Sequence, residues 1–189
     1  MLQTMQENTI NGVDFTLIKM PENEYDSVHF INCNFSKSDL ASISFVECFF
    51  DNCDFSLGKL NNTAFIDAKF KNCKLLGLDF ARCKDFLLSF TFENCTLDYA
   101  SFFKKKIKKT VFKNCSIKEV DFSECDLSES KFLDCDLTMS VFQQSVIEKV
   151  DFRTSHHYGI DLELNKVKGA KFSNEGISGL LHKYKIVIE

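Results

Sequence analysis

The sequence predicts an all-β fold, a solenoid of four-sided coils in which each side is five residues long. The segment Phe-x-Asn/Asp-Cys recurs six times, with spacings of 20, 20, 22, 20 and 20 residues. Within each repeat a bulky apolar residue returns at every fifth position. A period of five fits neither an amphipathic helix nor an alternating strand, so the pattern indicates a repeat architecture.

The residue at the centre of each five-residue unit is expected to point into the coil. Most of the 21 phenylalanines occupy such positions. One column of this predicted core contains Phe30, Phe50, Phe70, Phe92, Phe112 and Phe132. Coils would stack at the strand spacing of about 4.8 Å, so about eight coils would make a rod roughly 40 Å long.

Asparagine recurs two positions after the central phenylalanine, where the chain must turn a corner. The column contains Asn32, Asn52, Asn72, Asn94 and Asn114. Asn tolerates positive φ, and stacked amides can hydrogen-bond from coil to coil. We therefore expect Asn to be the corner residue and to form a ladder.

The nine cysteines all lie two residues before the centre of a unit, a position that calls for a small inward side chain. Six form one predicted core column: Cys33, Cys53, Cys73, Cys95, Cys115 and Cys135. A linear column cannot enclose a tetrahedral zinc, and parallel Cβ vectors do not suit disulfides. The chain shows no N-terminal signal segment and no membrane span, so we expect a cytoplasmic protein with reduced, buried thiols.

Charge is unevenly distributed along the chain. The net charge of −4 argues against direct nucleic-acid binding, which favours a basic stripe. Between residues 119 and 136 a single base, Lys131, accompanies seven acids: Glu119, Asp121, Glu124, Asp126, Glu129, Asp134 and Asp136. Just upstream is a basic patch of Lys104, Lys105, Lys106, Lys108 and Lys109. These lysines either face an acidic partner or form a solvated face that offsets the acidic coil.

The first break in the repeat is a two-residue insertion within residues 81–91. Phe86, Leu87, Leu88 and Phe90 cannot all point inward, and Leu87 alone keeps the later phase. Phe86 and Leu88 are therefore candidate partner contacts, unless the insertion is only a locally repacked corner.

Two further positions depart from the repeat. Lys105 occupies the small inward position, so it must bulge the backbone or extend its ammonium group outward. In residues 153–159, His157 replaces an apolar centre, which predicts a kink before Ile160, Leu162, Val167 and Phe172 resume the phase. Adjacent histidines on a strand point to opposite faces, so His156 and His157 are not expected to chelate a metal, and no cofactor is expected.

The solenoid is expected to occupy residues 1–172 and a cap residues 173–189. Ser173 or Asn174 would begin a short helix, followed by an apolar strand at residues 186–188. The cap either shields the end of the solenoid or pairs with a second copy. The candidate dimer contacts are Ile177, Leu180, Leu181, Tyr184, Ile186 and Ile188.

The five-residue units resemble those of a known family. Cys-Asp-Phe-Ser-Leu57, Val-Asp-Phe-Ser-Glu124 and Cys-Asp-Leu-Ser-Glu129 resemble the pentapeptide-repeat family, over about residues 10–172. The tail from Gly159 to Phe172, with 180–188, is similar to the ending of its topoisomerase-protecting members, the quinolone-resistance (Qnr) and microcin B17 immunity type. The resemblance implies a right-handed quadrilateral β-helix.

The resemblance also implies a function without catalysis. Such a protein would bind DNA gyrase or topoisomerase IV as a homodimer joined at its C-terminus, and would protect the enzyme from quinolone or peptide poisons. The seven acids of residues 119–136 would be the gyrase-facing surface. A 40 Å length of B-DNA carries roughly 24 negative charges, so mimicry of DNA could only be local. The alternative is an interaction scaffold with an unrelated partner. We find no phosphate loop, metal-ligand spacing or activated nucleophile that would predict an enzyme.

Overall fold

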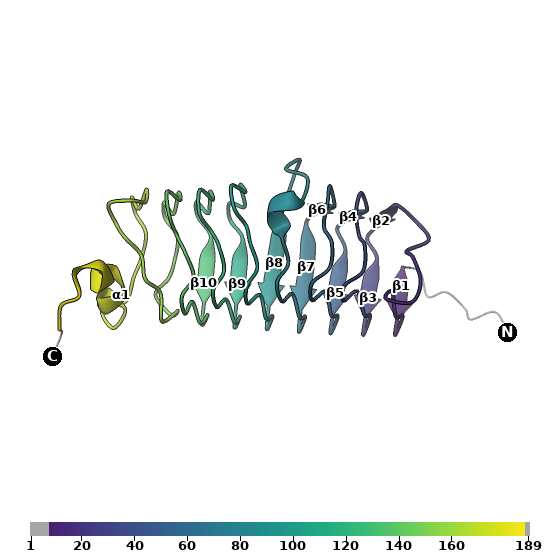
Figure 1. Ribbon diagram of the computed structural model, residues 1–189, viewed down its shortest axis with the longest axis horizontal. Coiled ribbons are helices and arrows are strands. Elements are labelled where there is room, and N and C mark those ends of the chain that lie inside the picture. Colours follow the sequence, from purple (N-terminus) through teal and green to yellow (C-terminus); the bar gives the residue numbers. More distant parts are fainter. Residues whose placement is uncertain (1–7, 188–189) are drawn as a thin grey trace.

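The computed structural model describes residues 8–187, which form one elongated stack of coils (Figure 1). Seven parallel strands run along the stack in the order β1-β3-β5-β7-β8-β9-β10. They are β1 (Thr9–Asn11), β3 (His29–Ile31), β5 (Phe49–Asp51), β7 (Ala68–Lys71), β8 (Phe90–Glu93), β9 (Val111–Lys113) and β10 (Lys131–Leu133). A second sheet contains β2 (Glu24–Asp26), β4 (Ser44–Val46) and β6 (Ala64–Ile66). The predicted β-solenoid is confirmed.

The pairing register follows the sequence repeat. Phe50 pairs with Phe70, Phe70 with Phe92 and Phe92 with Phe112, so the 22-residue spacing is absorbed without a shift of register. About six turns separate β1 from β10. Isolated bridges from Lys131 to Asp151 and from Asp151 to Lys171 continue the stacking toward the C-terminus. The regular strands thus cover fewer than the expected eight coils, and single bridges replace strands beyond them.

Each coil has four corners, because a residue with positive φ recurs every five positions. Within one coil these are Asn52, Leu57, Asn62 and Asp67, with φ of 54°, 58°, 58° and 49°. The Asn column has φ of 51–54° throughout. Lysine, glutamate, leucine and serine occupy other corners, so Asn is only one of several corner residues. The closed stack holds each of them in the left-handed region at a local cost.

The Asn ladder is formed in part. The Nδ2 of Asn94 donates to Oδ1 of Asn72 at 3.1 Å, and Asn114 donates to Asn94 at 3.2 Å. Asn52 donates to Asn32 at 2.6 Å. Asn72 turns aside and donates to Asp51, which interrupts the ladder.

The core consists of phenylalanine rings stacked from coil to coil. All six predicted central phenylalanines are buried. Phe112 stacks on Phe92 at 5.2 Å and on Phe132 at 4.6 Å between ring centroids. It also meets Phe122 edge-on at 6.0 Å and 80°. Offset stacks along the rod and edge-to-face contacts across it are the two favourable aromatic arrangements.

The nine cysteines are free and buried. Seven of the thiols lie near carbonyl oxygens of the preceding coil, as in Cys53 to Phe30 at 3.5 Å and Cys73 to Phe50 at 3.4 Å. Hydroxyls at the same position make the same bond, for example Ser145 to the carbonyl of Phe122 at 2.8 Å. The inward position therefore selects a small donor, because it satisfies a buried carbonyl. Burial raises the pKa of the Cys48 thiol to about 11, so it stays protonated at neutral pH.

The C-terminal helix is capped by Gly176 and not by Ser173 or Asn174 as expected. Helix α1 (Ile177–Leu181) is followed by the 3₁₀ helix η2 (His182–Tyr184). Gly176 precedes α1, with its N–H bonded to Ser173. Residues 185–187 contain no strand, so that part of the prediction is wrong over the described residues, while Ile188 lies outside them. No helix within residues 8–187 has the length and apolarity needed to cross a bilayer.

The last coil also corrects the predicted phase. Tyr158, not His157, enters the core, and Leu162 is exposed. Asn165 fills the inward position, where its amide donates to Phe142 and its Oδ1 accepts from the Ser145 N–H. His157 occupies a corner instead, with φ of 61°. The original phase returns at Asn165 and at Val167, which is partly buried against the core.

Candidate partner-binding surfaces

The insertion forms a loop that projects from one side of the rod (Figure 1). It follows the 3₁₀ helix η1 (Phe80–Arg82). The N–H of Lys84 bonds to Thr63 at 2.8 Å and that of Ser89 to Phe65 at 3.2 Å. The four residues 85–88 therefore occupy the place that a single residue, Ala64, occupies in the preceding coil. Because there is no room for all four in the stack, they bulge outward.

Side chains hold the loop at both ends. The Nζ of Lys105 lies 2.6 Å from Oδ1 of Asp85 and 2.7 Å from the carbonyl of Cys83. At the other end Ser89 donates to Asp67 at 2.9 Å. The Lys105 side chain is only 6% exposed, so it neither bulges the backbone nor extends into solvent as expected. It reaches along the rod axis instead, because the loop supplies two oxygens for its ammonium group.

The tip of the loop exposes two apolar side chains. Phe86 is 74% and Leu87 62% exposed, whereas Leu88 is 8% and Phe90 5% exposed. Leu87 occupies a corner with φ of 52°. The prediction that Leu87 keeps the inward phase is wrong, and Leu88 is a core residue. The exposed candidates for a partner contact are Phe86 and Leu87.

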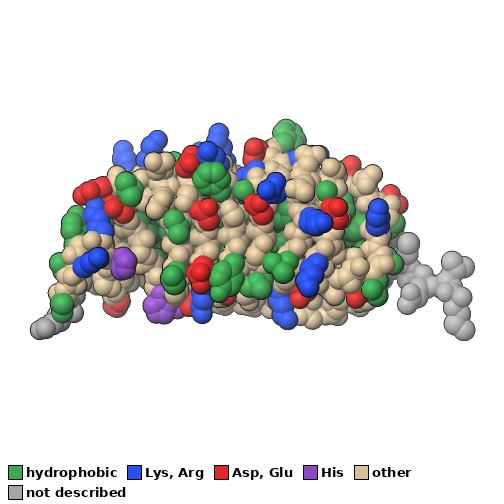
Figure 2. Space-filling view, in the orientation of Figure 1, with side chains coloured by type: hydrophobic (Ala, Val, Ile, Leu, Met, Phe, Trp, Pro, Cys, Tyr) green, Lys and Arg blue, Asp and Glu red, His purple; other side chains and the backbone are tan. Residues whose placement is uncertain are grey.

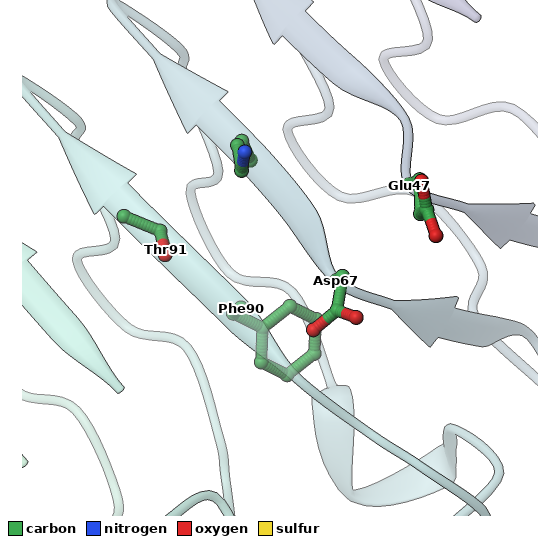
Figure 3. A pocket seen from close by; sticks show the side chains of 5 residues that line it. Glu47, Asp67, Phe90 and Thr91 are labelled. Carbon is green, nitrogen blue, oxygen red and sulfur yellow. The ribbon is translucent and has the colours of Figure 1, made fainter. Parts of the chain in front are cut away.

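A shallow hollow of about 410 Å³ lies at the base of this loop. It is lined by Glu47, Asp67, Lys69, Phe90 and Thr91, and Figure 3 shows the carboxylates of Glu47 and Asp67 beside it. Asp67 and Glu47 occupy stacked corners one coil apart. This hollow combines charged walls with the edge of the Phe90 ring, and it adjoins the Ser89 end of the loop.

The seven acids of residues 119–136 fall into two classes. Asp121, Asp126 and Asp136 are half-buried and accept hydrogen bonds from the N–H groups two residues ahead. These three carboxylates stabilise turns. Glu119, Glu124, Glu129 and Asp134 are exposed and have positive φ, which places them at four successive corners. They therefore point to four different sides of one coil and do not share a face.

Lysines of the neighbouring coil offset several of these charges. Lys104 lies 3.5 Å from Glu124, and Lys108 lies 3.1 Å from Asp126. Acidic and basic side chains alternate over the face shown in Figure 2, with apolar side chains between them. Two lysines of the basic patch thus pair with acids of the next coil, whereas buried Lys105 pairs with Asp85.

An exposed apolar edge was missed by the sequence reasoning. Leu57, Tyr99 and Met139 occupy one column of corners, with Gly77 and Glu119 between them. All three are exposed, and the N–H groups of Leu57, Gly77 and Tyr99 bond to the next coil in the same manner. Bulky apolar residues at corner positions, where polar residues prevail, are the signal that could have found this edge.

The C-terminal end presents a second apolar surface. Ile177, Tyr184 and Ile186 are exposed, whereas Leu180 packs against the core and Leu181 is half-buried. Lys183 holds the cap to the last coil through Asp161 at 2.9 Å and Glu163 at 2.8 Å.

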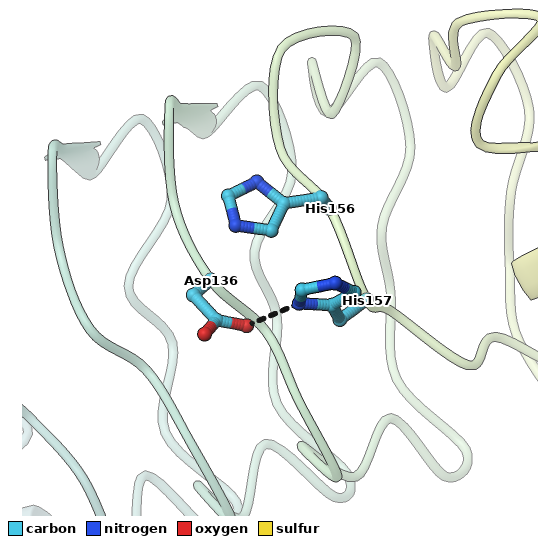
Figure 4. Close-up of side chains that lie close together, drawn as sticks. All are labelled: Asp136, His156 and His157. Carbon is cyan, nitrogen blue, oxygen red and sulfur yellow. Dashed lines mark hydrogen bonds and ion pairs between the residues drawn. The ribbon is translucent and has the colours of Figure 1, made fainter.

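The two adjacent histidines lie on the same side of the rod. His157 Nδ1 is 2.9 Å from Oδ1 of Asp136, and the two imidazole centroids are 4.6 Å apart (Figure 4). The prediction of opposite faces is wrong, because His157 is a corner residue with φ of 61° and strand alternation does not apply there.

The repeat connects these features to known proteins. The family described as the pentapeptide repeat region matches residues 23–102 and 86–162. The chain belongs to the pentapeptide-repeat family. No curated protein is significantly similar to it.

Among solved structures, this pentapeptide-repeat protein is similar to QnrB1, a plasmid-mediated fluoroquinolone resistance protein. Full-length QnrB1 is 19% identical, with a TM-score of 0.56 over 94% of this chain and 97% of QnrB1. A trypsin-treated variant of QnrB1 is 20% identical, with a TM-score of 0.51 over 96% and 98% of the two chains. The likeness establishes a common fold.

Membership of the pentapeptide-repeat family explains most side chains as parts of the coil. The remainder are the residues that the repeat does not require. They are the loop tip of Phe86 and Leu87, the corner edge of Leu57, Tyr99 and Met139, the exposed cap residues, and the pair His156 and His157.

Proposed function

We propose that this pentapeptide-repeat protein binds a type II topoisomerase, DNA gyrase or topoisomerase IV, and protects it from quinolone or peptide poisons without catalysing a reaction. The observation that carries the proposal is the match to QnrB1 over nearly the whole of both chains. The similarity of the C-terminal tail to topoisomerase-protecting members supports it independently. A cytoplasmic location follows from this function, since the target enzyme acts on intracellular DNA.

The inserted loop is the proposed point of contact with the enzyme. Phe86 and Leu87 supply exposed apolar area, and aromatic side chains are common energetic centres of protein interfaces. Lys105 and Ser89 hold the loop at both ends, which lowers the entropy lost on binding. Leu88 contributes by anchoring the tip in the core, and not by contact.

Mimicry of DNA contributes little to this proposal. Duplex DNA presents one negative charge per about 1.7 Å along its axis. Here the exposed corner acids of one coil face four sides, and Lys104 lies beside Glu124. Only the corner acid on the side that faces the enzyme would therefore contact one of its basic groups.

The protein is further proposed to act as a homodimer joined at the cap. Exposed Ile177, Tyr184 and Ile186 surround the end of the rod, where an apolar surface would otherwise meet water. A two-fold contact there would give a rod with one copy of the loop on each half.

Gyrase supercoiling in the presence of a fluoroquinolone tests the proposal. We expect near-stoichiometric protein to restore supercoiling, and the double variant Phe86→Ser/Leu87→Ser to lose at least tenfold in potency. Leu17→Ser is the matched control, because Leu17 is an exposed apolar residue on the first coil. No rescue by the wild type, with either a quinolone or a peptide poison, would contradict the proposal.

The alternative is a scaffold for an unrelated protein. The exposed corner edge of Leu57, Tyr99 and Met139 favours it, since this edge runs along the rod and is separate from the loop. Capture of a partner that requires Tyr99 and Met139, together with no binding to gyrase, would establish this function instead.

A further inference from the structure

We propose that Asp136, His156 and His157 form a binding site for one divalent transition-metal ion. Each offers one ligand atom, and these three atoms lie within 4.8 Å of one another. The group includes neither the loop tip of Phe86 and Leu87 nor the exposed cap residues Ile177, Tyr184 and Ile186, so the inference does not depend on the proposed function.

The backbone brings the ligands together. His156 lies directly above Asp136 in the stack, since the two residues form a parallel bridge between coils. His157 then turns the corner in the left-handed conformation, which keeps its ring on the same side as that of His156. The rings meet edge-to-face at 84°, so their planes do not block each other. A side chain at an ordinary extended position would have pointed to the other face.

The spacing suits a metal with short bonds. Zinc binds imidazole nitrogen and carboxylate oxygen at about 2.0–2.2 Å, which places neighbouring ligand atoms of a tetrahedral site about 3.3–3.6 Å apart, so a pair slightly closer than this needs only a small adjustment. His157 Nδ1 and Asp136 Oδ1 are already 2.9 Å apart. A metal would take the place of the proton between these atoms, and rotation of the exposed His156 ring would complete the set.

The surroundings hold the carboxylate in position. Thr138 donates to Oδ1 of Asp136 through its hydroxyl at 2.6 Å, and Lys118 lies 3.2 Å from Oδ2. Such outer contacts orient metal ligands in known sites. The Lys118 ammonium group weakens cation binding by repulsion, although it contacts the oxygen that does not face His157.

The donor set selects the class of ion. Two imidazoles and one carboxylate suit Zn²⁺, Ni²⁺, Co²⁺ or Cu²⁺, whereas Mg²⁺ and Ca²⁺ prefer oxygen ligands. A hollow of about 220 Å³, lined by both histidines, Glu175 and residues of α1, adjoins the site. An ion bound here would join the coil of Asp136 to the corner that supports the cap.

Titration calorimetry with zinc chloride on the reduced, chelator-treated full chain is the test. We expect one equivalent to bind in the micromolar range, and His156→Ala and His157→Ala each to weaken binding at least tenfold. Both side chains are exposed, so these variants should fold, which circular dichroism will verify. His182→Ala is the matched control and should bind as the wild type does.

The absorption spectrum of a Co²⁺ complex tests whether cysteines are among the metal ligands. We expect a Co²⁺ complex without a thiolate charge-transfer band, because the nine thiols are buried. The proposal would be overturned by an absence of zinc binding at millimolar concentration, by unchanged affinity in both folded histidine variants, or by a thiolate band.

Discussion

The ammonium group of Lys105 lies 2.6 Å from the carboxylate of Asp85 and thereby ties the inserted loop to the following coil. The two partners differ in environment, since the lysine side chain is 6% and the aspartate side chain 81% exposed. Lys105 occupies an inward position where the repeat normally has a small side chain. Its ammonium group positions the inserted loop, which is not part of the repeat.

Replacing this lysine should loosen the loop and leave the rod folded. In Lys105→Met the carbonyl of Cys83 loses its hydrogen-bond donor, which destabilises the fold by about 1–3 kcal/mol. The variant also no longer buries a charge, which offsets part of that loss. We expect hydrogen exchange of residues 84–89 to accelerate, while the free energy of unfolding changes by about 1 kcal/mol. Lys104→Met, which removes an exposed ion pair, is the control and should leave loop exchange unchanged.

The phenylalanine stack should dominate stability. Phe112 is fully buried between Phe92 and Phe132, so Phe112→Ala should lower the free energy of unfolding by about 3–5 kcal/mol. Urea denaturation measures this loss. Phe86→Ala, at an exposed loop position, should change stability by no more than about 0.5 kcal/mol. Equal losses in the two variants would contradict the assignment of core and surface.

The corner conformation should be measurable separately from the amide ladder. Asn94 has φ of 54° and makes ladder bonds to Asn72 and Asn114. Both Asn94→Gly and Asn94→Ala remove these bonds, but only alanine pays the left-handed penalty of about 1–2 kcal/mol. Thermal unfolding should rank wild type above glycine and glycine above alanine. An alanine variant as stable as the glycine variant would show that the corner relaxes.

The exposed cap residues allow a test of the proposed dimer. Leu180 packs against the core, so a charge there would also disturb the fold. Ile177→Asp with Ile186→Asp alters two exposed cap residues and should give a folded monomer in sedimentation velocity. Leu17→Asp, on the opposite end of the rod, should remain dimeric. A wild type that sediments as a monomer at micromolar concentration would refute the proposed dimer.

Acid should weaken the acidic coil through its structural aspartates. Partial burial alone would raise the pKa of Asp126, but hydrogen bonds from Ser128 and Lys108 lower it below its ordinary 3.8. Because the pKa of Asp126 is lower in the folded than in the unfolded protein, its carboxylate stabilises the fold fully above the unfolded value of about 3.8. This contribution is lost as the pH falls through the lower pKa of the folded state. Asp126→Asn should be less stable than the wild type by about 1–2 kcal/mol at pH 7. The difference should shrink below about pH 3.8; a constant difference from pH 7 to pH 2 would contradict the assignment.

The regular part of this fold was predictable because one side chain in five decides it. Phe112 and Cys115 recur with a fixed period, and a buried stack at strand spacing is the arrangement that satisfies both positions. The path of the inserted loop was not predictable, because two neighbouring residues were equally suited to point into the core. Leu87 and Leu88 are identical in chemistry, and the hydrogen bond from Ser89 to Phe65 decides which one turns inward.

The candidate sites show the same division. Counting acids along residues 119–136 could not separate the three aspartates that stabilise turns from the four acids at corners, nor show that successive corners face different sides. For His156 and His157, the strand alternation rule failed because His157 is itself a corner residue. Lys105 was recognised as exceptional from its position, yet its partner Asp85 lies 20 residues away in a segment whose path the repeat does not specify.

The stacked register fixes the axial distance between the inserted loop and the C-terminal cap. Each coil contacts only its neighbours, and the 22-residue repeat returns to the same register as the 20-residue repeats. The axial separation between the projecting loop and the C-terminal cap is therefore an integer number of coils. Removing or duplicating a whole coil, such as residues 116–135, would change that separation by about 4.8 Å and leave both ends intact. The number of coils between the loop and the cap therefore sets their separation in steps of about 4.8 Å. Variants with one coil more or fewer would measure the distance between two contact points on a partner.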